Sequence, residues 1–577
     1  MTKIIIIGGG ISGLSSYLFL QKHLLSSPSH AHYDVRIYDP HNITAPSFPG
    51  LQHGISGSAD IEPGGAKESF TSPTTIGGAI GISKNGLNVV SRLDADLLDS
   101  PVKQTLTRGH PVRYWDIETA RGFKIASINT SATKHVDSLG NTASDTSTMG
   151  MIARQVFIEI LYDHFKQVAP TMDILQHKKV FEVVVGDDET PNIVKFEDGS
   201  QEEADLVIGA DGLRSVVRKA MFASYEPKDA HNHESPSWFR SWIEWLSFGK
   251  VKHQDKKVKC DYVTPHYEGL VGLGGFVPSS ILESTGHKPG SMAVVFGPNG
   301  FFGYGYVTSD TDQWGETPPE AAQRRSLAGW WSTFSSKDPY PFHKLAEDTQ
   351  GRRDANSGNR VFDPILALTS LVSRHSTWKN SSVSAVVRYV QQSYEDYHRP
   401  LKSATSSENT PGTRMETDPS SSFGLLQTSY ATYTTPELPH WHIGGRAILI
   451  GDAAHALQPS SGQGASQALE DAETLALVLA HYLSPTSDPG RPSYPYKAAE
   501  KALATFETIR KPRVHTIYEY SQRMSQMKSD MSFVMEWIMY FMIWVMSSSN
   551  QSYNDDLLEY DLPSVVRETI GSIEKAG

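Results

Sequence analysis

The first twenty residues carry the feature that most restricts how this chain can fold. Ile4 to Ile7 form a run of β-branched residues, which is typical of a strand buried on both faces. The run leads directly into residues 8–13, Gly-Gly-Gly-Ile-Ser-Gly, and residues 14–20 are apolar at helical spacing. A Gly-x-Gly-x-x-Gly sequence between a strand and a helix predicts a nucleotide-binding turn.

Each glycine of this turn has a physical role in nucleotide binding. Gly8 allows the tight turn, Gly10 lets the backbone approach a pyrophosphate at the helix N-terminus, and Gly13 lets the helix pack on the strand. A second strand is expected over residues 33–38. It ends at Asp39, whose carboxylate can accept hydrogen bonds from ribose hydroxyls. The pattern predicts a dinucleotide but does not separate NAD from FAD.

Composition narrows the remaining choices. A chain of 577 residues is expected to form two or three domains. Its net charge of −12, without a long basic run, argues against nucleic acid as the main partner. The single cysteine, Cys260, excludes an internal disulfide and cysteine-based metal sites. Residues 1–7 lack the long apolar region of a signal peptide, so we expect an intracellular protein, cytoplasmic or peripherally membrane-associated.

Two later segments repeat the pattern of a strand followed by a glycine-containing turn. Residues 204–218 predict a buried strand, a turn at Asp211-Gly212 and a helix, and residues 446–455 predict a strand that ends at Gly451-Asp452. The chain then continues through Pro459 to Gly-Gln-Gly-Ala at residues 462–465, which opens a predicted helix over 465–480. With these motifs, the sequence resembles the class A FAD-dependent monooxygenases, the para-hydroxybenzoate hydroxylase-like family. The resemblance extends from Met1 to about Arg513.

The resemblance implies FAD as the cofactor and a role for each motif. Asp452 would accept a hydrogen bond from a ribityl hydroxyl, Pro459 would lie beside the isoalloxazine, and the helix that begins near Gly464 would direct its positive end at the flavin. In the family, the Asp211-Gly212 motif touches both FAD and, transiently, the pyridine nucleotide. We expect Arg218 either to brace that motif or to form a surface salt bridge.

Two further segments match the family. Residues 78–86 resemble its strand-to-helix segment beside the flavin, and residues 152–161 resemble its arginine-bearing helix, in which Arg154 would contact the ribityl–pyrophosphate region. The alternative for Arg154 is an ordinary surface arginine. Asp39 departs from the family pattern, which usually has Glu followed by a basic residue. The predicted cofactor-binding residues are Gly8, Gly10, Gly13, Asp39, Arg154, Asp211, Gly212, Gly451, Asp452, Pro459, Gly462, Gly464 and Ala465.

We therefore expect an α/β plus α+β fold, in which a Rossmann-like FAD-binding domain is interleaved with a mixed β-sheet substrate domain and followed by C-terminal helices. The predicted limits are 1–225 and 440–525 for the FAD-binding domain, 226–439 for the substrate domain and 526–577 for the C-terminal part. Residues 292–307 predict two strands of the substrate-domain sheet joined by Pro-Asn-Gly, and residues 112–115 predict another strand of that sheet. Their aromatic residues either line an apolar pocket or form ordinary sheet core; these are Phe301, Phe302, Tyr304 and Tyr306.

The family uses FAD, transiently bound NAD(P)H and O2, and forms a flavin C4a-hydroperoxide that gives one oxygen atom to the substrate. The resemblance implies hydroxylation or epoxidation of a bulky hydrophobic compound, of specialised (secondary) metabolism. No catalytic base or metal site is assigned, and His455 is expected to pack structurally. One alternative is a flavin-dependent halogenase, although residues 329–332 lack the Trp-x-Trp-x-Ile-Pro signature. The other is a non-catalytic carrier on a GDP-dissociation-inhibitor-like fold, which Asp452 disfavours.

The C-terminal segment 531–546 is unusual for this family. It is apolar except for Glu536, and as a helix it would be roughly 24 Å long, shorter than a hydrocarbon core of ~30 Å. A spanning helix is therefore not favoured. Two alternatives remain open: an interfacial membrane anchor with Trp537, Tyr540 and Trp544 near the headgroups, and a helix packed on the FAD-binding domain or on a second subunit.

Overall fold

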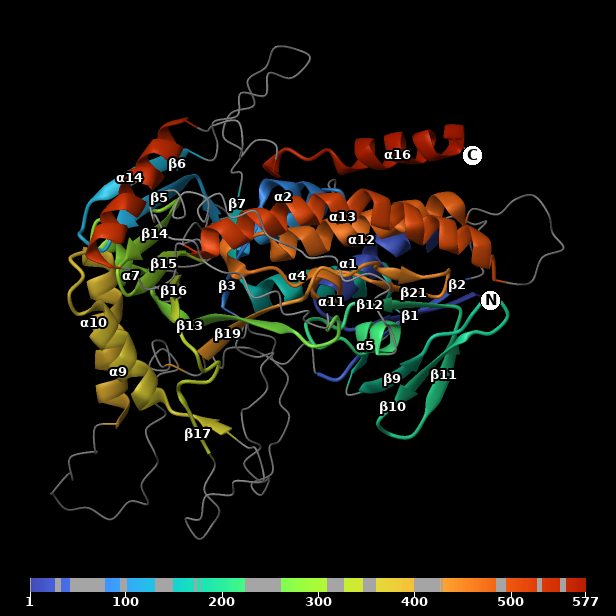
Figure 1. Cartoon of the computed structure of the whole chain (residues 1–577), viewed down its shortest axis with the longest axis horizontal. Helices are drawn as coiled ribbons and strands as arrows, with labels where there is room; N and C mark the ends of the chain where they lie inside the picture. Colours follow the sequence, from blue (N-terminus) through green and yellow to red (C-terminus); the bar gives the residue numbers. More distant parts are fainter. Residues whose placement is uncertain are drawn as a thin grey trace, which may run out of the picture.

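The computed structural model places the ordered elements of the chain in two neighbouring parts (Figure 1). It describes residues 2–25, 33–41, 78–93, 101–129, 149–170, 174–176, 178–223, 261–308, 326–345, 360–398, 426, 429–483, 494–526, 532–549 and 557–576. Cys260 lies outside these residues.

The first part is built on a mostly parallel sheet. β1 (Thr2–Ile7) pairs in parallel with β12 (Leu206–Gly209) on one side and with β2 (Tyr33–Asp39) on the other, and β21 (Ala447–Leu449) pairs in parallel with β12. The edges are β20 (His442–Ile443) and β8 (Leu175–Gln176). Because neighbouring parallel strands end at the same edge, the turns that follow β1, β12 and β21 meet there. These strands are apolar and buried on both faces.

Helices cover this sheet. α1 (Ile11–Leu20) packs against α12 (Gly464–Tyr482), and α12 packs in turn against α13 (Tyr496–Gln526), which lies along it in Figure 1. α12 also contacts α2 (Lys84–Ser91) and the C-terminal α16 (Leu562–Ala576). A small antiparallel sheet lies toward the opposite side in the same view and consists of β9 (Val180–Val184), β10 (Asn192–Phe196) and β11 (Gln201–Ala204).

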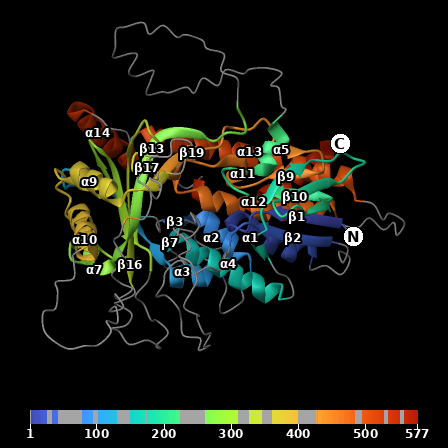
Figure 2. The same cartoon turned by 90° about the horizontal axis from the view of Figure 1, so that it is seen from below.

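The second part is a seven-stranded mixed sheet, which we call the roof sheet. Its order is β19 (Ser429–Thr434), β13 (His266–Pro278), β16 (Leu327–Ser335), β15 (Gly300–Tyr306), β14 (Ser291–Gly297), β5 (Tyr114–Thr119) and β6 (Lys124–Asn129). The predicted hairpin over 292–307 corresponds to β14 and β15, which pair antiparallel. In Figure 2 the sheet stands beside the helices of the first part.

Two details differ from the sequence-based expectation. The strand predicted over residues 112–115 is divided at Arg113: β4 (His110–Val112) joins a small sheet with β7 (Met149–Ala153) and β3 (Ala79–Ser83), while β5 begins the roof strand. Since β5 and β6 lie within the expected 1–225 segment, the roof sheet takes two strands from it. The segment expected to belong only to the FAD-binding domain therefore also contributes strands to the roof sheet.

The outer face of the roof sheet is closed by α9 (Pro364–His375) and α10 (Ser381–His398). Phe302, Tyr304 and Tyr306 belong to the buried cluster on this face, and Phe302 stacks on Trp330 at 5.7 Å. Phe301 lies in a separate buried cluster with residues of α14 (Phe533–Ser549). The interpretation of these four residues as sheet core is thus correct, and the apolar-pocket alternative is wrong.

α14 packs on the roof sheet, not on the FAD-binding part of the chain as one alternative proposed. Its Met539, Tyr540 and Ile543 contact Phe296 and Phe301 in one buried cluster. Among the described helices, none combines the length and the apolar composition needed to cross a bilayer.

A buried group of charges joins α12 to α13. Arg510 is fully buried, and its Nε lies 2.8 Å from Asp471 Oδ1 and its Nη1 2.5 Å from Glu470 Oε2. Arg513 adds a contact of 3.3 Å to Glu470. Burial opposes the charged form of Glu470, but attraction to Arg510 and Arg513 outweighs it and keeps the pKa of Glu470 below its usual value.

Removing the central cation should destabilise the fold. In Arg510→Met, Glu470 and Asp471 lose their buried partner, and breaking a buried pair costs about 3–5 kcal/mol. Urea unfolding of the flavin-free chain measures this loss. The difference from the parent protein should shrink as the pH falls through the lowered pKa values of Glu470 and Asp471 in the folded parent, because protonation there removes their attraction to Arg510. Lys497→Ala, which removes an exposed pair with Glu500, is the control and should cost at most about 1 kcal/mol. Equal stability of Arg510→Met and the parent would contradict this account.

Candidate functional site

The loop after β1 forms a cradle that only glycine permits. Gly8 has φ +106°, and a Cβ atom on it would lie 2.4 Å from the carbonyl oxygen of Ala210. A Cβ atom on Gly13 would lie 1.8 Å from the carbonyl oxygen of Gly8. At Gly10, by contrast, no heavy atom lies within 4 Å of the Cβ position. Gly8 and Gly13 are therefore fixed by packing, while Gly10 faces open space at the start of α1.

Asp39 ends β2 beside this loop. Its Oδ2 accepts a hydrogen bond of 2.7 Å from the backbone N–H of Gly9, and its Oδ1 accepts one of 2.7 Å from the N–H of His41. The shorter side chain thus ties the glycine turn to β2. Its carboxylate still has lone pairs available for a further donor, because an ionised carboxylate can accept about four hydrogen bonds.

The second motif lies against the first. Asp211 follows β12, and its Oδ2 accepts a hydrogen bond of 2.7 Å from the N–H of Val216 at the start of α5 (Val216–Phe222). Its other oxygen, Oδ1, is buried and has no hydrogen-bond partner among the described residues. Burial raises the pKa of Asp211, and hydrogen bonds from Ser215 and Val216 oppose that shift. Gly212 has φ +73°, which allows the turn.

The third motif completes the group. Gly451 has φ +55°, and a Cβ atom there would lie 2.1 Å from Ser12 Oγ, so the end of β21 touches the first turn of α1. Asp452 begins α11 (Asp452–His455) and is exposed. Further along, Pro459 opens a short 3-10 helix and Gly462 ends it with φ +63°. α12 then begins at Gly464, one residue earlier than predicted, with Ala465 half-buried.

Arg154 is the cation of this site. It is the first residue of α4 (Arg154–Val168) and is half-buried, and its guanidinium makes no hydrogen bond or ion pair within the described part of the chain. Burial lowers the pKa of Arg154, and the carboxylates of Asp452 and Asp39 oppose that shift. A cation with unused N–H donors therefore lies within electrostatic range of two predicted cofactor ligands.

Buried polar residues hold the motifs in place. Arg218 is fully buried, and its Nη1 donates a 2.8 Å hydrogen bond to the carbonyl of Ala453 while its Nη2 donates to the carbonyl of Leu213. It braces the second motif against the third, as one of the two interpretations predicted. The surface salt bridge is wrong.

Asp471 was not singled out from the sequence, although it holds the third motif. Its Oδ2 accepts a 2.8 Å hydrogen bond from the N–H of Gly451 and lies 2.6 Å from His455 Nε2, while its Oδ1 pairs with Arg510. His455 is buried and makes this contact, which fits the structural role expected for it. The available signal was the pair of adjacent acidic residues, Glu470 and Asp471, within the predicted helix.

The arrangement fits FAD. The space beside Gly10 is open, and two groups have no hydrogen-bond partner among the described residues: the guanidinium of Arg154 and Oδ1 of Asp211. A dinucleotide carries the complementary pyrophosphate and hydroxyl groups. No cluster of metal-binding side chains was found among the described residues.

Comparisons with known proteins agree with this geometry. Residues 371–519 match the family model of the FAD binding domain. Over 79 residues the chain is 42% identical to the FAD-dependent monooxygenase penM of Penicillium crustosum, which is 14% of this chain and 16% of that protein. Over 458 residues it is 24% identical to the FAD-dependent monooxygenase penE of Penicillium thymicola, covering 77% of this chain and 70% of the relative.

A solved structure has the same fold. HpxO of Klebsiella pneumoniae, complexed with FAD and uric acid, aligns with a TM-score of 0.57 and 16% identity over 97% of this chain and 96% of that chain. At this identity the likeness concerns the fold, and it confirms the predicted fold class. The match to the FAD binding domain confirms FAD as the cofactor expected from the sequence.

The contrast between Gly10 and Gly13 can be tested directly. Gly13→Ala should prevent stable folding, because its Cβ would overlap the carbonyl of Gly8. Gly10→Ala should fold normally, since its φ of −74° suits alanine and its Cβ meets no protein atom, yet it should weaken FAD binding at least about tenfold by occupying the cradle. Thermal melting of the flavin-free proteins and FAD titration measure the two effects. Normal FAD affinity of Gly10→Ala would show that the cradle is not used.

A second variant pair tests the cation. Arg154→Gln should reduce FAD affinity roughly 10- to 100-fold, because hydrogen bonds to charged groups contribute about 1.5–3 kcal/mol. The matched control is Arg108→Gln. Arg108 lies outside α4 and pairs at 2.8 Å with Glu159, which is on the same helix as Arg154. FAD fluorescence titration should separate the two. If both variants bind FAD as the parent does, Arg154 has no role in the site.

Proposed function

From its resemblance to the class A FAD-dependent monooxygenases, which the comparisons confirm, we propose that this chain is an intracellular FAD-dependent monooxygenase. It would take electrons from transiently bound NAD(P)H and insert one atom of O2 into a bulky hydrophobic small molecule by hydroxylation or epoxidation. Its similarity to fungal FAD-dependent monooxygenases supports a place in specialised metabolism.

The convergence of the three glycine turns at one sheet edge is the observation that carries this proposal. Residues 8–13 and the N-terminus of α1 would hold the pyrophosphate, Asp39 the adenosine ribose, and Arg154 and Asp452 the ribityl region. Bound FAD supplies the redox chemistry and the activation of O2. The protein would bind and orient the cofactor and exclude water.

The proposed substrate space lies between this edge and the roof sheet. The sheet face opposite α9 and α10 carries a buried cluster of Met151, Met292, Val307 and Leu327, with Trp115 and Trp331 packed against it. Met151 belongs to β7, the strand that leads into Arg154. This buried apolar packing close to the cofactor residues supports the exclusion of water, and the hydrophobic substrate is what the resemblance implies.

The structure gives no specific support to the two alternative functions, a flavin-dependent halogenase and a non-catalytic carrier without flavin. Trp330 and Trp331 point to opposite faces of β16, one into the outer core and the other into the apolar cluster on the inner face. The match to an FAD binding domain disfavours a carrier without flavin.

Turnover tests the function. The FAD-loaded protein should oxidise NADPH or NADH faster when a suitable polycyclic, terpenoid or phenolic substrate is present, and mass spectrometry should detect a product heavier by one oxygen atom. Labelled O2 should supply that atom. If every compound class gives only uncoupled peroxide, the monooxygenase proposal fails even if FAD is bound.

A further inference from the structure

α14 presents a row of large apolar side chains to solvent. Phe533 and Val534 are 61% and 65% exposed. About one, two and three turns further along the same face, Trp537, Phe541 and Trp544 are 46%, 63% and 54% exposed. With Val545 these residues form one stripe, which we call the α14 stripe. No residue of this stripe is charged. Exposed apolar area of this extent on one helix indicates a binding surface.

The opposite face of α14 is fixed to the roof sheet. Glu536 is fully buried and accepts hydrogen bonds from Arg121 Nε and Nη2 at 3.0 and 2.7 Å. Tyr540 donates a hydrogen bond of 2.9 Å to the carbonyl of Phe296. The charge that interrupts the apolar sequence is thus neutralised on the inner face. The helix is held along the surface with its apolar stripe outward.

The stripe continues onto the roof sheet and reaches a lysine-bearing cavity. Phe123, in the turn between β5 and β6, is 41% exposed and its ring lies 6.0 Å from that of Trp537. Phe123 also lines a cavity of about 480 Å³, which is bordered by Lys124, Lys288 and Lys379. Lys379 is held at this turn, because its N–H donates to the carbonyl of Ala120 at 2.7 Å.

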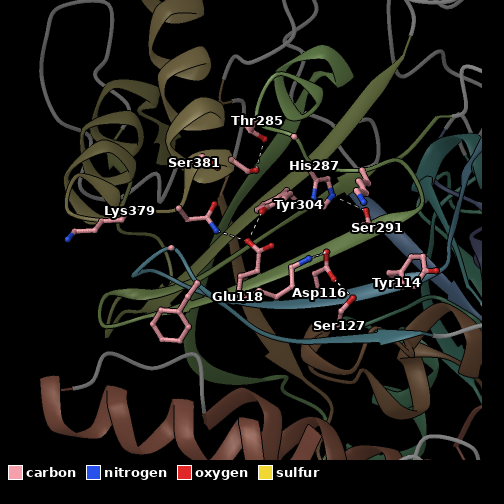
Figure 3. Close-up of a pocket in the computed structure, with 17 residues that line it drawn as sticks. Tyr114, Asp116, Glu118, Ser127, Thr285, His287, Ser291, Tyr304, Lys379 and Ser381 are labelled. Atoms are coloured by element: carbon pink, nitrogen blue, oxygen red, sulfur yellow. Dashed lines mark hydrogen bonds and ion pairs between the residues drawn. The ribbon is translucent and has the colours of Figure 1, made fainter. Parts of the chain in front are cut away.

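The two acidic residues of this cavity differ in their partners, because Asp116 pairs with a cation and Glu118 binds neutral donors. Asp116 pairs with Lys124 at 2.6 Å, and Glu118 accepts hydrogen bonds from Tyr304 at 2.9 Å and from Asn380 at 2.6 Å. Figure 3 shows Glu118 and Tyr304 pointing toward one another, while Lys379 points away from them. Lys288 and Lys379 are exposed and make no ion pair among the described residues, so the three lysines of this cavity outnumber its two carboxylates, Asp116 and Glu118.

We propose that the α14 stripe, together with Phe123, Lys288 and Lys379, binds the surface of a bilayer that contains anionic lipids. Aromatic side chains on an exposed helical face enter the boundary between headgroups and acyl chains, and nearby lysines attract anionic headgroups. The exposed lysines favour this occupant over a second copy, because in a symmetric dimer the same lysine-bearing patch of each chain would face the other and the lysines would repel one another.

The surface adjoins the proposed substrate space. Trp115 and Trp331 pack against the buried cluster that joins α14 to the roof sheet at Phe301. They also pack against the buried cluster that contains Met151. We infer that an apolar substrate dissolved in the membrane would meet the protein on the side of the roof sheet that faces the cofactor residues. This last step rests on the proposed function, whereas bilayer binding itself does not.

Vesicle co-sedimentation of the full chain tests the proposal. The parent protein should bind phosphatidylcholine vesicles that contain about one third phosphatidylserine more tightly than vesicles of phosphatidylcholine alone, because the anionic headgroups attract the lysines. Val534→Gln/Phe541→Gln should weaken binding to both vesicles about tenfold, because it removes two exposed apolar side chains. Lys288→Gln/Lys379→Gln should weaken binding only to the anionic vesicles, by roughly fivefold per lysine.

The matched control is Val361→Gln/Ile365→Gln, which changes two side chains that are each 59% exposed and lie away from α14. It should bind vesicles as the parent does, and thermal melting should show that all variants are folded. Two results would overturn the proposal directly: no vesicle binding by the parent, or equal vesicle binding by Val534→Gln/Phe541→Gln and the parent. A third would do so by showing a second copy as the occupant: the parent is a dimer, and Val534→Gln/Phe541→Gln makes it a monomer without any loss of vesicle binding. Since the assay needs neither FAD nor turnover, its failure is distinct from failure of the monooxygenase proposal.

Discussion

The site depends on close backbone contacts that leave no room for a side chain. Gly8 lies against Ala210, Gly13 against Gly8, and Gly451 against Ser12. The contacts of Gly8 with Ala210 and of Gly451 with Ser12 bring together chain segments that are separated by two hundred residues or more. Parallel pairing of β1, β12 and β21 places the turns at one edge, and the missing Cβ atoms let them approach within contact distance.

Buried charged side chains hold the turns at this sheet edge in fixed positions relative to one another. Arg218 joins the second motif to the third through backbone carbonyls, and Asp471 holds the N–H of Gly451 while it pairs with His455 and Arg510. Such a network is costly to desolvate, and its members must all be present for it to be stable. It fixes where β21 ends relative to α12. The exposed carboxylate of Asp452 and the N-terminus of α12 are therefore held on a rigid support.

Local patterns in the sequence were sufficient to predict the cofactor-binding part of the fold. The β-branched run at Ile4 to Ile7, the glycines that follow and the small residues at the start of α12 each act within a few positions, so their elements could be predicted. The roof sheet could be predicted only in part. Its hairpin has a local turn signal, but the pairing of β14 with β5 depends on residues far apart in the chain.

Long-range pairs account for most of what the sequence did not reveal. Glu536 interrupts an apolar segment and suggested an imperfect membrane helix, whereas its partner is Arg121, 415 positions away. The Asp39 carboxylate was expected to face a ribose, and no local pattern shows that it also binds the N–H of Gly9. Only the folded chain reveals which buried polar groups have partners and which, like Arg154, have donors left for a ligand.

Calorimetric titration of the flavin-free chain with FAD tests the central claim most directly. The account predicts saturable binding of one FAD per chain, with a flavin absorption spectrum that is shifted by the protein environment. A correctly folded chain that stays colourless and releases no heat with FAD would contradict it.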